Sequence, residues 1–82
     1  MRVLVVDDDP IAVKLLVRTL SHAGYDVVAA HDGLEALELM RSGDIRVVVS
    51  DWLMPGMSGV ELFRQIRRNQ HSGYVYLILV TS

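Results

Sequence analysis

The chain has 82 residues and a mass of 9.2 kDa, which allows one small hydrophobic core, so residues 1–82 are expected to form a single domain. Apolar residues make up 51%, and eight basic against ten acidic residues give a net charge of −2, a composition that excludes a disordered chain and argues against direct nucleic-acid binding. The chain has no cysteine and no apolar run near the roughly 18 residues of a spanning helix, so we expect a cytoplasmic protein without disulfides, thiolate zinc sites or membrane contact.

The first third of the chain predicts a strand, a helix and a second strand. Residues 2–6 are almost continuously apolar, as in a strand buried on both faces of a parallel sheet. Asp9-Pro10 then predicts the start of a helix, with Asp9 as the N-cap, and Ala23-Gly24 predicts its end. A second strand is expected over residues 25–30.

Two capping boxes predict the second and third helices. Asp32 is followed three residues later by Glu35, and Ser58 is followed in the same way by Glu61. The faces expected to pack on the sheet consist of Gly33, Leu34, Ala36, Leu37 and Met40 in the second helix and of Leu62, Phe63 and Ile66 in the third. Ser42-Gly43 and His71-Ser72-Gly73 are expected to end these helices.

Two further apolar runs, residues 45–50 and 74–80, predict the third and fourth strands. Strands and helices therefore alternate along the whole chain, with short connections. This order predicts an α/β protein, a three-layer αβα sandwich in which right-handed crossovers join parallel strands.

Polar side chains follow three of the predicted strands directly. Asp7 and Asp8 come after the first strand, Asp51 after the third and Thr81 after the fourth. Ligands of such sheets bind beyond the carboxyl ends of the strands, so we expect these side chains to lie close together. Three carboxylates without histidine or cysteine favour a hard cation, and Mg²⁺ suits such a set.

Three segments carry a resemblance to a known family. They are Val5-Val6-Asp7-Asp8-Asp9-Pro10, the segment DWLMPGMSG from Asp51 to Gly59, and Leu79-Val80-Thr81-Ser82. In these segments, and from Val3 to Ser82, the chain resembles the receiver domain of two-component response regulators. The resemblance implies the flavodoxin-like topology of that family.

The resemblance also implies the roles of individual residues. Asp51 is then the phosphoacceptor, taking a phosphoryl group from a phosphohistidine of a sensor histidine kinase or a histidine phosphotransfer protein. Asp7, Asp8, Asp51 and the main-chain carbonyl of Leu53 are then the Mg²⁺ ligands, and the Thr81 hydroxyl bonds the phosphoryl group. We expect Pro55-Gly56 and Gly59 to let the loop after Asp51 turn sharply, with the Leu53 carbonyl towards the ion.

The resemblance ends with the fourth strand. Receivers similar to this chain continue through a fourth helix, a fifth strand that ends in a lysine, and a fifth helix. We therefore interpret the chain as the N-terminal portion of a receiver, and we do not expect its one lysine, Lys14, to replace the family's. The uncharged run from Tyr74 to Val80 is expected to form an apolar edge strand, a site for self-association.

Two other functions remain open at this point. An Asp-nucleophile phosphatase would use two aspartates spaced one residue apart, which Asp7-Asp8-Asp9 can supply, but it leaves the Asp51 segment unexplained. A receiver-like docking module that is never phosphorylated is the second alternative. We expect a phosphoacceptor and not an enzyme.

Overall fold

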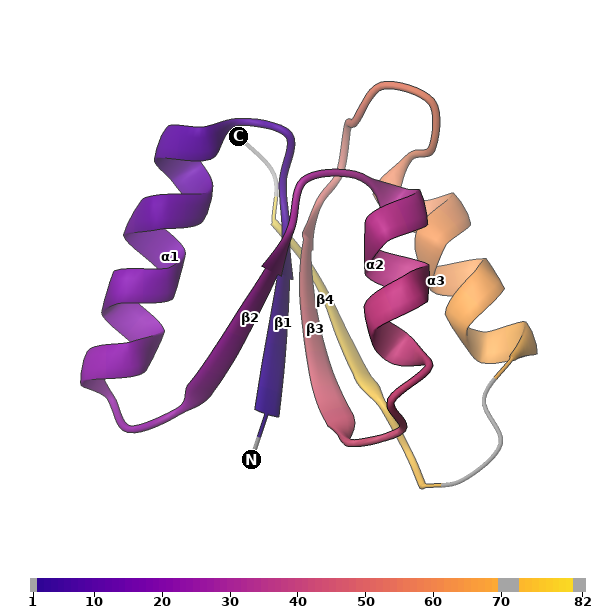
Figure 1. Ribbon diagram of the computed structural model, residues 1–82. Helices are drawn as coiled ribbons and strands as arrows, with labels where there is room; N and C mark the ends of the chain where they lie inside the picture. Colours follow the sequence, from indigo (N-terminus) through magenta and orange to yellow (C-terminus); the bar gives the residue numbers. More distant parts are fainter. Residues whose placement is uncertain (1, 70–72, 81–82) are drawn as a thin grey trace.

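The computed structural model describes residues 2–69 and 73–80, which form one sheet and three helices (Figure 1). The elements in chain order are β1 (Arg2–Val6), α1 (Pro10–His22), β2 (Asp26–Ala30), α2 (Gly33–Met40), β3 (Ile45–Asp51), α3 (Gly59–Arg68) and β4 (Tyr76–Val80). All seven predicted elements are present. The boundaries differ at three strands: β2 begins at Asp26, β3 includes Asp51, and β4 begins at Tyr76, two residues later than expected.

The four strands are parallel and lie in the order β2-β1-β3-β4. Helix α1 covers one face of the sheet, while α2 and α3 lie side by side on the other face (Figure 1). The predicted three-layer αβα architecture is therefore confirmed. Across residues 2–69 and 73–80, no helix has the length and apolar character needed to cross a membrane.

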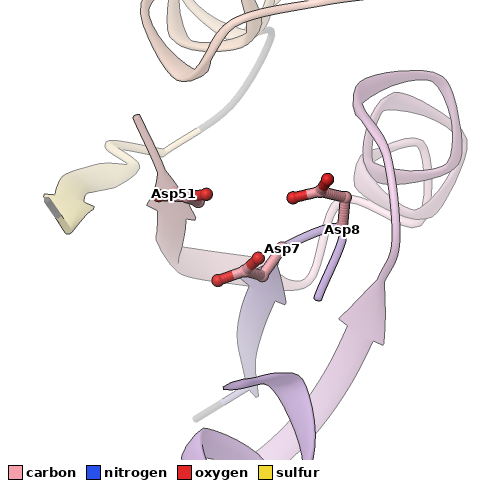
Figure 2. A group of neighbouring side chains, drawn as sticks. All are labelled: Asp7, Asp8 and Asp51. Atoms are coloured by element: carbon pink, nitrogen blue, oxygen red, sulfur yellow. The ribbon is translucent and has the colours of Figure 1, made fainter. Parts of the chain in front are cut away.

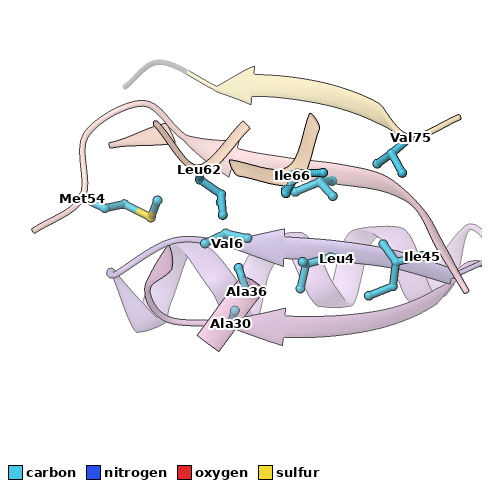
Figure 3. Packing of buried hydrophobic residues seen from close by; sticks show 10 residues of the cluster. Leu4, Val6, Ala30, Ala36, Ile45, Met54, Leu62, Ile66 and Val75 are labelled. Atoms are coloured by element: carbon cyan, nitrogen blue, oxygen red, sulfur yellow. The ribbon is translucent and has the colours of Figure 1, made fainter. Parts of the chain in front are cut away.

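Strand β1 lies at the centre of the sheet and is buried on both of its faces. Leu4 and Val6 point towards α2 and α3, and Val3 and Val5 point to the face that α1 covers. Figure 3 shows the larger cluster, between the sheet and the helix pair. Its buried members are Leu4, Val6, Ala30, Ala36, Ile45, Val48, Met54, Leu62, Ile66 and Val75.

One predicted core residue is wrong. Leu34 was assigned to the packing face of α2, yet it is 73% exposed. Gly33 and Ala36, which are both buried, bring the start of α2 close to its neighbours. Leu34 is therefore turned outward, although its spacing relative to Leu37 is helical.

The three helices begin at the predicted N-caps. The side chains of Asp9, Asp32 and Ser58 accept hydrogen bonds from backbone N–H groups of the first helical turn, at 3.0, 2.8 and 3.1 Å. In the Asp32 box, the Glu35 carboxylate accepts from the backbone N–H of His31, the residue before the cap, at 2.6 Å. The His31 ring lies 3.2 Å from the same carboxylate, so Glu35 reaches one residue further back than a capping box requires.

Candidate functional site

Three carboxylates meet where the direction of the chain across the sheet reverses. The chain passes from β1 to β2 on one side and then to β3 on the other, so the carboxyl ends of β1 and β3 form the switch point. Asp7 and Asp8 follow β1, and Asp51 ends β3. One oxygen from each carboxylate lies within 4.8 Å of the others. Figure 2 shows the three side chains directed at a common space.

Asp7 is the most constrained of the three. Its backbone N–H donates to the Ala30 carbonyl at 3.2 Å, which continues the β1–β2 pairing, and its carboxylate accepts from the Asp9 backbone N–H at 2.9 Å. Burial raises the pKa of Asp7 above its usual value, and the neighbouring charges of Asp51, Asp8 and Asp9 raise it further, whereas the hydrogen bond from Asp9 opposes the shift. Burial and the neighbouring carboxylates thus both disfavour the ionised form of Asp7.

Asp51 is fixed by its place in the sheet. It pairs with Val80 across β3 and β4, and the backbone N–H of Trp52 donates to the Val80 carbonyl at 3.2 Å. Asp51 is half-buried, like Asp7, whereas Asp8 is exposed. The phosphoacceptor candidate is thus held by backbone bonds on one side and faces the two other carboxylates on the other.

The loop after Asp51 is anchored in the core by Met54. Met54 is buried, whereas the two residues before it, Trp52 and Leu53, are exposed. Gly56 has a φ of 83°, which agrees with the expected sharp turn. Gly59 does not have a positive φ, so the turn is not the reason for a glycine at that position.

The donor set fits a hard divalent cation. Three carboxylates within 4.8 Å offer oxygen ligands of the kind that Mg²⁺ prefers, and two of the three are partly withdrawn from solvent. Burial is the main cause of the raised pKa of Asp7, and repulsion from the neighbouring carboxylates adds to it. A bound cation would remove that repulsion.

Other sequence-predicted residues lie elsewhere or are not described. Thr81 lies outside the described residues, and the ligand role of the Leu53 carbonyl stays a prediction. Asp9 caps α1 through its side chain, as expected. Its backbone N–H bond to Asp7 was not predicted, although an aspartate two residues before a helix cap favours such a turn. Lys14 is exposed on α1.

Comparison with known proteins agrees with this geometry. The family model described as "Response regulator receiver domain" matches residues 3–82. The chain belongs to this family. The resemblance seen in the Asp7 and Asp51 segments is therefore confirmed.

Two curated relatives illustrate the family. The chain is 48% identical over 67 residues to Response regulator MprA of Mycobacterium avium, a match that covers 82% of the chain and 29% of that protein. It is 34% identical over 83 residues to Chemotaxis protein CheY-3 of Vibrio cholerae, covering 100% of the chain and 64% of that protein. The chain thus spans less than two thirds of either relative.

A solved structure shows the same fold with a ligand. The response regulator TrrA of Thermotoga maritima, in complex with Mg²⁺-BeF, superposes with a TM-score of 0.88 at 40% identity, covering 98% of this chain and 68% of that one. A second structure holds TrrA in complex with the histidine kinase ThkA, again with a TM-score of 0.88. The solved relatives of this fold therefore include one bound to Mg²⁺-BeF and one bound to a histidine kinase.

Proposed function

We propose that this receiver domain accepts a phosphoryl group on Asp51 from the phosphohistidine of a sensor histidine kinase or a histidine phosphotransfer protein. The observation that carries the proposal is the placement of Asp51 within 4.8 Å of Asp7 and Asp8 at the switch point of the sheet. The kinase complex of TrrA, 40% identical to this chain, supports the choice of partner. In this role the chain is a phosphoacceptor and not an enzyme.

We further propose that Asp7, Asp8, Asp51 and the main-chain carbonyl of Leu53 hold Mg²⁺. The Mg²⁺-BeF complex of TrrA supports this assignment. The bound ion offsets the negative charge that otherwise repels an anionic phosphoryl group from the acid cluster.

The protein's own residues position the nucleophile. A carboxylate oxygen of Asp51 forms the new P–O bond while the P–N bond to the donor histidine breaks, and the electron pair of that bond stays on the imidazole nitrogen. The backbone bonds to Val80 fix the strand end that carries Asp51. In this proposal the Thr81 hydroxyl donates a hydrogen bond to the transferred group.

Phosphorylation of variants tests the assignment. The protein is incubated with Mg²⁺ and either acetyl phosphate or a phosphorylated histidine kinase, and the site is located by mass spectrometry. Asp51→Asn abolishes the modification, whereas Asp9→Asn retains it because asparagine caps a helix about as well as aspartate. A phosphoryl group on any other residue of the wild-type protein overturns the proposal.

The same experiment addresses the two alternatives. A docking module gives no phosphorylation at all, and a phosphatase gives turnover of a phosphoester without a stable aspartyl phosphate. The phosphatase reading needs Asp9 as an acid beside Asp7, yet the Asp9 carboxylate accepts the Ile11 backbone N–H at 3.0 Å as a helix cap. Residues 7–9 are thus divided between the acid cluster and the cap.

We also propose self-association through β4. In the described part of the chain β4 is an outermost strand, and Tyr76, Ile78 and Val80 are 62%, 48% and 41% exposed. The occupant that fits this edge is a second copy of the chain, since the strand carries no charge to oppose pairing with itself. A cytoplasmic location and the absence of nucleic-acid binding stay predictions.

A further inference from the structure

Gly59 is the first residue of α3 and is buried against the backbone of the phosphoacceptor candidate. A Cβ atom at this position would overlap the carbonyl oxygen of Asp51 and lie 2.6 Å from Cδ2 of Leu79. Real Cβ atoms essentially never come within 3.0 Å of another heavy atom in this way. Because Gly59 has no positive φ, the space, and not the backbone conformation, requires the glycine.

Neither side of this contact is free to move alone. Asp51 is held by its pairing with Val80 in β4. Helix α3 is held by Leu62 and Ile66, both buried in the core, and by the Gly59 backbone N–H, which donates to the Trp52 carbonyl at 2.9 Å. A side chain at position 59 therefore displaces either the strand end or the loop that follows it.

We propose that Gly59 is a positioning residue for the acid site. By lacking a side chain, it lets the start of α3 rest on the Asp51 carbonyl and so sets where the Asp51 carboxylate lies relative to Asp7 and Asp8. An ordinary contact there requires a shift of more than about 0.5 Å, which exceeds the roughly 0.5 Å within which a functional site must be held. The inference rests on the proposed function, because it concerns the same metal and phosphoryl site.

The two close contacts of Gly59 differ in kind. The Leu79 contact is with the end of a flexible side chain, which truncation to alanine removes. The Asp51 contact is with backbone, which no side-chain substitution removes. The proposal therefore predicts that shortening Leu79 does not rescue a variant at position 59, whereas a purely local packing role predicts that it does.

Gly33 provides a matched control. It is also buried and also the first residue of a helix, α2, and a Cβ there would lie 2.6 Å from Sδ of Met57. Cβ and Cγ of Met57 would lie at 3.0 and 3.1 Å, so the contact under 3.0 Å is with the flexible part of the side chain and none of the three atoms is acid-site backbone. The same change from glycine to alanine thus tests helix-start packing at one site and acid-site geometry at the other.

Magnesium affinity provides the readout. The wild-type protein, Gly59→Ala, Gly33→Ala and the double variant Gly59→Ala/Leu79→Ala are titrated with Mg²⁺, following the fluorescence of Trp52 next to Asp51, and thermal unfolding of each is recorded. Gly59→Ala weakens Mg²⁺ binding by about tenfold or more, the size typical of losing support around a metal ligand. The double variant remains as weak, and Gly33→Ala keeps the wild-type affinity.

Wild-type affinity in Gly59→Ala, or its restoration in the double variant, overturns the inference. If the wild-type protein itself shows no response to Mg²⁺, the proposed metal site is wrong, and the two failures are thereby distinguished. Should Gly59→Ala not fold, the wild-type amide spectrum decides instead. The Gly59 N–H resonance is then expected to shift on addition of Mg²⁺ while that of Gly33 stays in place, and an unmoved Gly59 resonance contradicts the proposal.

Discussion

Removing one charge from the acid cluster should stabilise the metal-free protein. The substitution Asp7→Asn keeps an oxygen that accepts the Asp9 backbone N–H, so the local turn is retained while the charge is lost. The pKa of Asp7 is raised by burial and by the charges of Asp51, Asp8 and Asp9. Its ionised form is therefore disfavoured in the folded state, and a neutral amide at this position avoids that cost.

The magnitude follows from the geometry. Two unit charges at 4.8 Å, the limit within which the ligand oxygens of the cluster lie, repel by about 0.9 kcal/mol in water and about 3.5 kcal/mol at an effective dielectric constant of 20. Asp7 and Asp8 adjoin in the unfolded chain as well, so the Asp7–Asp51 pair is the one that forms on folding. Screening by salt reduces this repulsion, while the burial of Asp7 adds to the cost of its ionised form. We therefore expect Asp7→Asn to raise the free energy of unfolding by about 1 kcal/mol, which corresponds to an increase in Tm of roughly 4–8 °C.

Thermal unfolding in the presence of a chelator and of excess Mg²⁺ measures this effect. With the chelator, Asp7→Asn melts above the wild-type protein, and Asp9→Asn, outside the cluster, melts close to it. With Mg²⁺ the wild-type protein gains stability through binding and the difference shrinks or reverses. Because the pKa of Asp7 is raised, the folded state binds the proton more tightly than the unfolded state does. In chelator, acidification towards the ordinary pKa of 3.8 therefore stabilises the wild-type protein relative to Asp7→Asn, and the difference in Tm between them becomes smaller.

The reasoning is refuted if Asp7→Asn is less stable than the wild-type protein in chelator while Asp9→Asn is unchanged. That result would mean that the Asp7 carboxylate contributes more through its hydrogen bond than it costs through repulsion. It would also remove the electrostatic reason for a cation at the switch point.

Two further predictions concern the scaffold. The Ser42 hydroxyl donates a hydrogen bond to the Asp44 carboxylate, and this bond is the largest cause of the lowered pKa of Asp44, to which Arg2 adds. In an NMR titration, Ser42→Ala should therefore raise the pKa of Asp44. Stability from Asp44 is present above its ordinary pKa and is lost as the pH falls through the lowered value, a loss that should be smaller in the variant. Leu62→Ala, at a site with 0% exposure, should cost about 2–5 kcal/mol by chemical denaturation, whereas Leu34→Ala, at 73% exposure, should change the free energy of unfolding little.

The fold could be predicted because the apolar pattern of the strands and the capping residues of the helices indicate the same alternation of elements. The run at residues 2–6 is apolar without alternation, and β1 is indeed buried on both faces. Asp9, Asp32 and Ser58 each precede a helix and each caps it. Leu34 was misplaced because helical spacing indicates a face only to within about a residue, and the width of the buried face depends on the small residues beside it.

The acid site could be predicted in part. Parallel strands place their carboxyl ends at one edge, so Asp7, Asp8 and Asp51 were expected together before any geometry was known. The role of Gly59 could not be read in this way. A glycine that gives room to a neighbour's backbone looks the same in a sequence as one that permits a turn, and only the position of the Asp51 carbonyl separates them.

The edge of the sheet carries the last prediction. The outward residues of β4 form a series that is self-complementary about Ile78, so that in an antiparallel pair Tyr76 of one copy faces Val80 of the other. We expect the mass in sedimentation to rise above 9.2 kDa with concentration. We expect Ile78→Lys to suppress that rise, because the two lysines would lie directly opposite each other at the centre of the pair and repel. Leu34→Lys introduces the same charge at a more exposed apolar residue away from β4 and should leave association unchanged. A wild-type protein that stays monomeric at all concentrations, or equal effects of the two lysines, would show that the open strand edge does not drive association.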